Sequence, residues 1–261
     1  MIMIDYYILN PTGNITALVT NNNILSDSYA EISNAIMKRH REVEQVGFID
    51  INGKTPKLRM SGGEFCGNAT MCTALLFSEL NDVTENNLLV EVYGVEKLIP
   101  VSISKNENGY DCIIQIPKPK NLYEMSFDID NESFVLPIVE FNGISHIIAN
   151  NRFDKKTAER IIKKYCGILN YKAMGIMLLN DKTYEMTPIV YVKKGNTLFY
   201  ENSCASGSSA VCYYLTKDSN IPKEFTLKQP GGNLTVSSSS SLDYIILKGN
   251  VIIINHFNEE I

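Results

Sequence analysis

Two cysteines of this 261-residue chain, Cys66 and Cys204, stand in similar sequence surroundings. Each lies where a turn of small residues leads into apolar residues at helical spacing. A thiol acts as a base when it is ionised and as an acid when it is protonated. Inversion of a carbon centre needs a base on one face and an acid on the other. The pair of thiols therefore indicates a cofactor-independent racemase in which both cysteines act on one substrate carbon.

The residues after each thiol are expected to begin a helix. The first N–H groups of a helix are unpaired, and the helix dipole is positive at this end. Gly67 and Asn68 follow the first thiol, and Ala205 and Ser206 follow the second. Their N–H groups are expected to hold the carboxylate of an amino acid and to stabilise the charge that develops as its α-proton leaves. The same helix ends are expected to lower the pKa of the thiols.

The other cysteines and the histidines suggest no second kind of site. No two cysteines have C-x-x-C spacing and the three histidines lie far apart, so we expect no metal. A thiol protease would need one cysteine with one histidine and would leave the second motif unexplained. The remaining cysteines are expected to be structural: Cys72, Cys112, Cys166 and Cys212.

The composition favours a globular protein with a small amino-acid ligand. The chain is 44% apolar and carries a net charge of −5. Nucleic-acid binding would need clustered Lys and Arg, so we expect no nucleic-acid partner. No stretch approaches the roughly 18 apolar residues that span a bilayer, so we expect no membrane association. Six cysteines without a signal-peptide pattern indicate a reducing, cytoplasmic location.

The chain repeats the order of its expected elements around the two thiols. After each thiol come a helical pattern, a strand, a glycine and another strand. Gly94 follows Cys66 by 28 positions (94 − 66), and Gly232 follows Cys204 by the same number (232 − 204). A helix and a strand are expected before each thiol, at about 26–41 and 45–51 in the first half and at about 155–165 and 173–179 in the second. The pattern predicts a duplicated α/β unit.

Two prolines mark the expected joint between the halves. Pro117 and Pro119 interrupt regular structure. We therefore expect an N-terminal domain at 1–117 and a C-terminal domain at 118–249. The final strand, within 250–261, is expected to return and complete the first domain.

These segments resemble those of the diaminopimelate epimerase-like superfamily, which works without pyridoxal phosphate, and the resemblance extends along nearly the whole chain. The two thiol segments match its active-site turns, 10–14 resembles a turn whose asparagine touches substrate, and Glu44-Gln45 resembles a pair that lines the pocket. The resemblance implies an α/β (α+β) fold of two pseudo-symmetric domains, each a curved, mostly antiparallel sheet or barrel around a central helix. It also implies an active site in the cleft between them, substrate contacts from Asn14, Glu44 and Gln45, no cofactor and, by analogy, a homodimer.

The segment before the second thiol differs from that of diaminopimelate epimerase. That enzyme has a Glu-Arg pair whose Arg holds the distal carboxylate, whereas Glu201 is followed here by Asn202. Residues 60–71, 201–204 and 229–232 instead resemble the histidine racemases, including those that make D-histidine for metallophores. This resemblance implies an isomerase that converts L-histidine to D-histidine. It implies that Glu44 accepts a hydrogen bond from the imidazole and that Glu201 holds the α-ammonium.

Two alternatives stay open at this point. The first is an epimerase of diaminopimelate or of a proline-type substrate, although the Asp-Arg-Ser-Pro-Cys phrase of proline racemases differs from residues 201–204. The second is a catalytically inactive protein that binds an amino acid. Binding alone needs only the N–H groups, so the presence of both thiols argues against it.

Ala205 and His146 are single positions whose roles can be predicted. Ala205 stands where the superfamily usually has Gly, so the backbone must be helical there. His146 lies in a segment that resembles a non-catalytic strand of the superfamily and is expected to be structural.

Overall fold

The computed structural model describes residues 2–20, 24–150, 153–219, 221–239 and 243–261. The chain folds as two compact units, of which unit 1 comprises Met1–Gln115 with Lys248–Ile261 and unit 2 comprises Ile116–Leu247. It passes between the units within two strands, β7 (Gly109–Pro117) and β16 (Tyr244–Glu260). Domain bounds at 117 and 249 stay a prediction, because both crossings lie inside strands.

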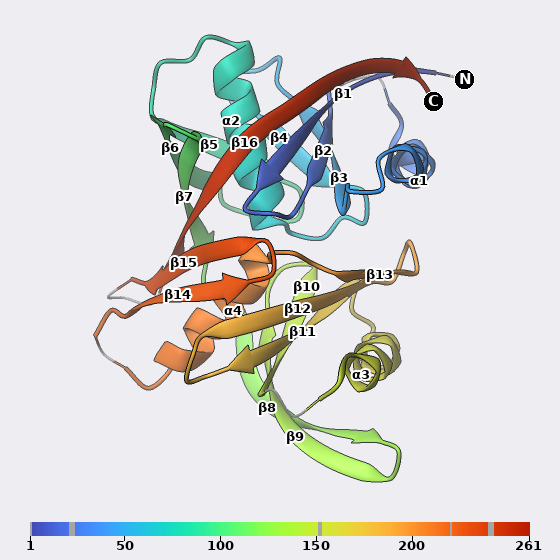
Figure 1. The fold of residues 1–261 in the computed structure, drawn as a ribbon, viewed down its shortest axis with the longest axis vertical. Helices are drawn as coiled ribbons and strands as arrows, with labels where there is room; N and C mark the ends of the chain where they lie inside the picture. The colour runs from blue at the N-terminus through green and yellow to red at the C-terminus, as the bar shows by residue number, and fades with distance from the viewer. Residues whose placement is uncertain (1, 21–23, 151–152, 220, 240–242) are drawn as a thin grey trace. The chain divides into compact units, whose positions relative to one another are not determined.

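Unit 1 is a closed ring of strands (Figure 1). The ring runs through β1 (Met3–Pro11), β2 (Thr16–Val19), β3 (Gln45–Asp50), β4 (Lys57–Met60), β5 (Asn87–Val92), β6 (Ile99–Asn106), β7 and the C-terminal part of β16. Strand β16 closes the ring because it pairs with β1 as well as with β7. The pairs β2–β3 and β4–β5 are parallel, and the other pairs of described register are antiparallel.

Helix α2 (Gly67–Leu80) lies inside this ring (Figure 1). Every residue from Gly67 to Phe77 is buried, and the helix packs against β1, β2, β4, β5 and β6. A helix that is apolar on all sides is stable only in a core. The sequence around the first thiol therefore produces the central helix expected for this half.

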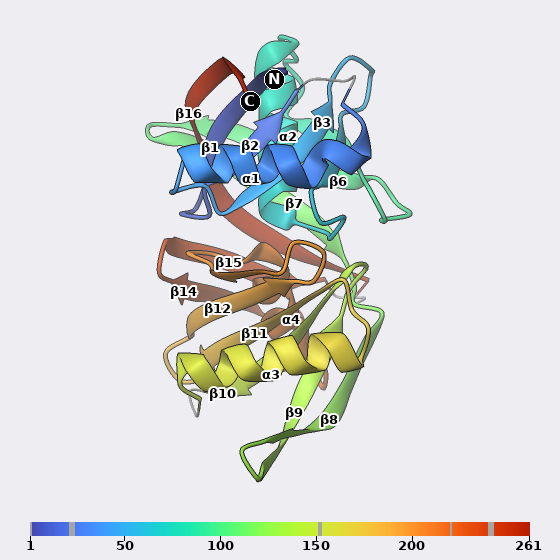
Figure 2. The ribbon, with the colours of Figure 1, turned by 90° about the vertical axis from the view of Figure 1, so that its right-hand side faces the viewer.

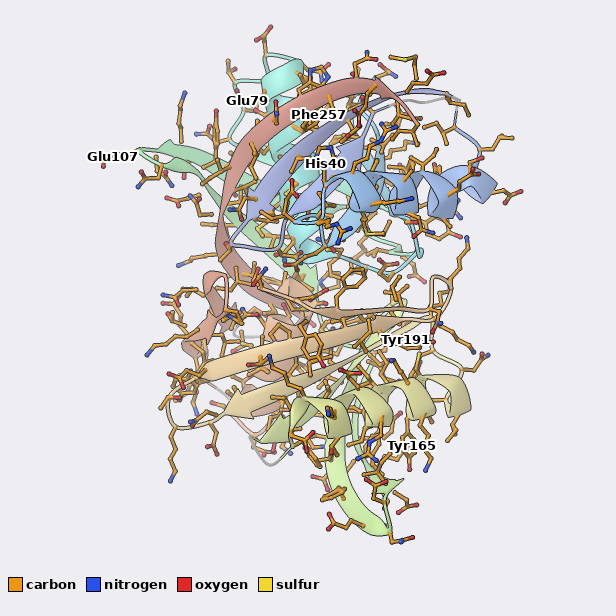
Figure 3. The ribbon with its side chains drawn as sticks, turned by 45° about the vertical axis from the view of Figure 1, so that its right-hand side comes forward. His40, Glu79, Glu107, Tyr165, Tyr191 and Phe257 are labelled. Atoms are coloured by element: carbon orange, nitrogen blue, oxygen red, sulfur yellow. The ribbon has the colours of Figure 1, made fainter. Side chains whose placement is uncertain are left out.

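Helix α1 (Tyr29–Arg39), preceded by the short 3-10 helix η1 (Ser26–Ser28), covers the outside of the ring (Figure 2). Its buried Ile32 and Ile36 belong to a core cluster with residues of β1, β2 and β3. His40 ends α1, and its ring centroid lies 4.6 Å from that of Phe257 on β16; both side chains are labelled in Figure 3. This contact ties the last strand of the chain to the outer helix of the same unit.

Unit 2 repeats the arrangement. In order of pairing, its strands are β8 (Asn121–Ile129), β9 (Glu132–Glu140), β10 (Ile144–Asn150), β11 (Ala173–Asn180), β12 (Glu185–Val192), β14 (Glu224–Gln229), β15 (Gly232–Ser238) and the start of β16, with β13 (Thr197–Tyr200) paired to β12. Helix α4 (Ala205–Thr216) packs against the inner side of the sheet, on β9, β10, β11, β14 and β15. Helix α3 (Lys155–Ile168) lies on the outside (Figure 2).

The outer helix of unit 2 is anchored by apolar packing and one buried hydroxyl. Ile161 and Ile162 of α3 are fully buried in a cluster with residues of β10, β11 and β12. Tyr165, labelled in Figure 3, accepts a hydrogen bond from the Asp128 N–H of β8 at 2.6 Å. These contacts hold α3 to the sheet on the side opposite to α4.

The two units share one order of strand pairings. From β1 to β6 the successive pairs are antiparallel, parallel, antiparallel, parallel and antiparallel. From β9 through β10, β11, β12 and β14 to β15 the order is the same. The predicted duplication is thus confirmed in the topology. Within the described ranges, no helix is long and apolar enough to cross a membrane.

Truncation of a buried side chain of the central helix should destabilise the protein strongly. Leu75 of α2 is fully buried, so Leu75→Ala should lower the free energy of unfolding by about 2–5 kcal/mol through lost transfer energy and a residual cavity. Leu80 of the same helix is 42% exposed, so Leu80→Ala should change it by about 0.5 kcal/mol or less. Urea denaturation followed by circular dichroism measures both, and equal losses would contradict the position of α2.

Candidate active site

Cys66 is the residue that starts helix α2. Its backbone is extended, with φ −134° and ψ 111°, and its sulfur accepts a hydrogen bond from the Ala69 N–H at 3.4 Å. The Cys66 carbonyl accepts from both the N–H and the hydroxyl of Thr70, at 3.1 and 2.7 Å. The thiol thus replaces the Ser, Thr or Asp side chain that commonly caps a helix.

Cys204 starts helix α4 in the same way. Its backbone has φ −133° and ψ 109°, and its sulfur accepts from the Gly207 N–H at 3.4 Å. The Ser208 hydroxyl donates to the Cys204 carbonyl at 2.7 Å, as the Thr70 hydroxyl does to Cys66 in unit 1. Ala205 is the first helical residue, as its side chain requires. The two thiols therefore share one local backbone conformation.

A network of side-chain amides surrounds the first thiol in unit 1. Asn14 Oδ1 accepts from Gln45 Nε2 at 2.5 Å and from Asn68 Nδ2 at 3.0 Å. Asn14 Nδ2 donates to Glu44 Oε2 at 2.6 Å, and the Cys66 thiol donates to Gln45 Oε1 at 3.2 Å. The structure therefore brings together five of the residues proposed from the sequence.

Thr16 belongs to this network, although sequence reasoning did not find it. Its hydroxyl accepts from Gln45 Nε2 at 2.8 Å, and it pairs with Gln45 in the parallel register of β2 and β3. Its hydroxyl also donates to the Asn14 carbonyl at 2.9 Å. Its place two residues after Asn14 was the available signal, because side chains two apart along extended chain point to the same side.

Different side chains surround the second thiol in unit 2. Glu201 lies beside Cys204 and accepts a hydrogen bond from its thiol, and the Ser206 hydroxyl lies 3.6 Å from its sulfur. Gln229 Oε1 accepts from the Cys204 N–H at 2.8 Å, and Gln229 Nε2 donates to the Ser208 hydroxyl at 3.1 Å. Gln229 therefore fixes the start of α4. The sequence of residues 229–232 indicates a family resemblance but no role for Gln229, because the role depends on the packing of β14 against α4.

The pKa of the Cys204 thiol is raised, which corrects the expectation that the helix end would lower it. Burial of Cys204 is the largest cause, and the negative charge of Glu201 and its hydrogen bond to the thiol raise the pKa further. The hydrogen bonds from Ser206 and the Gly207 N–H act in the opposite direction but are weaker. Burial and the neighbouring carboxylate therefore outweigh the helix dipole and favour the protonated thiol.

The remaining cysteines lie in the cores of the units. Burial raises the pKa of each of these thiols, so they are inert as nucleophiles or bases: Cys72, Cys112, Cys166 and Cys212. Among the residues that the structure describes, no group of three or more His, Cys, Asp or Glu side chains could hold a metal ion.

Removal of the Glu201 charge should ionise Cys204 more readily. Glu201→Gln should lower the pKa of Cys204, because both effects of the carboxylate raise it. The rate of Cys204 alkylation by iodoacetamide at a fixed pH, followed on its peptide by mass spectrometry, should therefore rise about three- to tenfold. Glu185→Gln, an exposed change on β12, is the control. An unchanged rate in Glu201→Gln would show that the carboxylate does not act on this thiol.

Comparison with known proteins places this geometry in a family. The family model described as "Histidine racemase CntK N-terminal domain" matches residues 3–256. A histidine racemase of Fusobacterium nucleatum is 38% identical over 239 residues, which cover 88% of this chain and 88% of that protein. A histidine racemase of Staphylococcus aureus is 30% identical over 249 residues, which cover 90% of this chain and 89% of that protein.

Solved structures of other enzymes share the fold. A protein described as a predicted epimerase from Pseudomonas aeruginosa has a TM-score of 0.72 at 13% identity, covering 98% of this chain and 99% of its own. A hydroxyproline epimerase from Agrobacterium vitis has a TM-score of 0.67 at 10% identity, covering 98% and 92%. At these identities the comparison supports the fold alone, whereas the family model extends over nearly the whole chain. The protein belongs to the histidine racemase family.

Proposed function

We propose that this protein interconverts L-histidine and D-histidine without a cofactor, by a two-base mechanism that uses Cys66 and Cys204. The observation that carries the proposal is the equivalence of these residues. Each starts the buried central helix of its unit with the same backbone conformation, and the two units have one topology. Membership of the histidine racemase family supports histidine as the substrate.

In the proposed reaction one cysteine acts as a thiolate and takes the α-proton, while the other, as a thiol, donates a proton to the opposite face. Two like groups can exchange these roles, so the reaction runs in both directions. The charge that develops next to the substrate carboxylate needs preorganised donors. The N–H groups of Gly67 and Asn68 on α2 and of Ala205 and Ser206 on α4 are proposed to supply them.

Glu201 is proposed to hold the α-ammonium group of the substrate. In the structure its carboxylate accepts a hydrogen bond from the Cys204 thiol and raises the pKa of that thiol. A bound ammonium would offset the charge of the carboxylate and would compete for it as a donor. Substrate binding would then lower the pKa of Cys204 and prepare it to act as the base.

Glu44 is proposed to accept a hydrogen bond from the substrate imidazole. Its carboxylate is oriented by Asn14 Nδ2, at 2.6 Å, within the amide network of the first thiol. The segment 201–204 lacks the Arg that holds a second carboxylate in diaminopimelate epimerase, and this favours a substrate whose side chain is a hydrogen-bond donor. Asn14 and Gln45 are proposed to complete the pocket.

The free cysteines bear on where the protein acts in the cell. All six cysteines are free thiols. The proposed mechanism requires that Cys66 and Cys204 stay reduced. We propose that the protein acts in the cytoplasm, where thiols stay reduced, and as a homodimer.

The mechanism predicts that each active-site cysteine is indispensable. Cys66→Ala and Cys204→Ala should each lower the rate of histidine racemisation by about 10²–10⁴-fold, because one proton transfer loses its acid or base. Loss of optical rotation and uptake of α-deuterium from L-histidine in D₂O measure the rate. Cys72→Ala and Cys212→Ala, at buried positions in the same two helices, are the matched controls and should keep most of the activity.

The same assay separates the alternatives. Uptake of deuterium into diaminopimelate or proline, but not into histidine, would identify a different substrate. Binding of histidine without any uptake would leave an amino-acid-binding protein. Racemisation at the parental rate in both active-site variants would end the two-base mechanism.

The role of Glu44 predicts a selective loss of affinity. Glu44→Gln should raise KM for histidine about tenfold, because a charged acceptor for the imidazole N–H is lost. Glu42→Gln, an exposed change two residues away, should leave KM unchanged. Steady-state racemisation assays measure KM for both variants. An unchanged KM in Glu44→Gln would exclude the imidazole contact.

A further inference from the structure

Two polar side chains, His146 and Ser206, connect the core of unit 2 to the second thiol. His146, on β10, is fully buried, and its Nε2 lies 2.9 Å from the Ser206 hydroxyl in the first turn of α4. The Ser206 hydroxyl lies 3.6 Å from Cys204 Sγ.

The surroundings of His146 indicate which ring nitrogen carries the proton. His146 Nδ1 is buried and has no hydrogen-bond partner among the residues that the structure describes. It faces the backbone of Gly175, where an added Cβ would lie 2.5 Å from Nδ1. A buried N–H without a partner costs more than a buried acceptor without one and is rarer. The proton therefore belongs on Nε2, where Ser206 accepts it.

The ring is also neutral. Burial lowers the pKa of His146 to about 3, so the imidazole carries no charge at neutral pH. A neutral ring with its proton on Nε2 can only donate to the Ser206 oxygen. A hydroxyl has one proton to give. A protonated Nε2 cannot accept the hydroxyl proton of Ser206. That proton is therefore available to another acceptor, and Cys204 Sγ is within reach.

We infer that His146 is a positioning residue: it donates from Nε2 to the Ser206 oxygen and so directs the Ser206 hydroxyl proton onto the Cys204 sulfur, which favours the thiolate. Its use in catalysis rests on the proposed function, whereas its effect on the thiol does not. Glu201 is the charged group that acts on Cys204 in the opposite direction, and the line of donors offsets part of its effect.

The position of His146 is occupied by an apolar residue in unit 1. Leu18 pairs with Gly47 in the parallel register of β2 and β3, as His146 pairs with Gly175 in that of β10 and β11. Leu18 therefore occupies in unit 1 the position of His146 in unit 2. The Cys66 thiol instead donates to the side-chain carbonyl of Gln45 at 3.2 Å. The fold was duplicated, but the donor at this position exists in one half only.

The test removes each donor and measures the reactivity of the thiol. Ser206→Ala keeps the backbone N–H but removes the hydroxyl, and His146→Leu installs the residue of unit 1. Each should raise the pKa of Cys204, so its alkylation by iodoacetamide at a fixed pH should slow about three- to tenfold. Ser209→Ala removes another buried hydroxyl of α4, which donates to the Ala205 carbonyl, and should not change the rate. The Cys66 peptide is the internal control in every sample.

The outcomes separate the possible arrangements. A faster rate in Ser206→Ala would mean that the hydroxyl accepts from the thiol, and an unchanged rate would mean that it does not act on the thiol; either result overturns the inference. A slower rate in Ser206→Ala alone would remove His146 from the line. ¹⁵N NMR of the unaltered protein gives an independent answer, because its three histidines leave few signals to assign. An Nδ1-protonated or charged His146 would overturn the inference even if His146→Leu fails to fold. None of these measurements needs racemase activity, so they stand or fall apart from the proposed function.

Discussion

Burial of the start of the central helix is the constraint on which each unit depends. The first N–H groups of a helix inside a closed or curved sheet are largely shielded from water, so the protein itself must provide acceptors for some of them. Cys66 and Cys204 do this with their sulfur atoms, which accept from Ala69 and Gly207 at 3.4 Å. The same requirement keeps each thiol at a helix N-terminus, next to the N–H groups proposed to hold a carboxylate. Stability and the proposed chemistry therefore need the same geometry.

Duplication explains the backbone of the two thiols but not their chemistry. Their φ and ψ angles agree to within a few degrees, and the strands around them pair in one order. The side chains differ: an amide carbonyl accepts from Cys66, whereas Cys204 lies between the Glu201 carboxylate and the Ser206 hydroxyl. Hydrogen bonds to a thiol and to a thiolate have opposite effects on its pKa. The two units thus place different side chains around the two thiols that are proposed to exchange roles.

Part of the site could be read from the chain. The turns into helices at the two cysteines are local patterns, and the resemblance of 10–14 and 44–45 to a known family identified Asn14, Glu44 and Gln45, which hydrogen bond to one another in the structure. Their contacts with substrate stay predictions. Gln229 was missed because it acts through a contact between a strand and a helix that no local pattern encodes. The only local signal for Thr16 was its place two residues after Asn14, and its contact with Gln45 comes from the pairing of β2 with β3. The pKa of Cys204 was predicted in the wrong direction because the helix end is visible in sequence and the depth of burial is not.

The sequence by itself determined the family, the duplicated order of elements and the two cysteines that begin helices. These follow from short-range rules, because small residues, helical periodicity and turn glycines act over a few positions. Only the tertiary structure decided the partners of each thiol. Ser206 meets His146 across 60 positions, and it does so because the parallel register of β10 and β11 sets His146 opposite a glycine inside the sheet. Whether a thiol keeps its proton depends on such distant neighbours and on the exclusion of water, which residue order alone does not reveal.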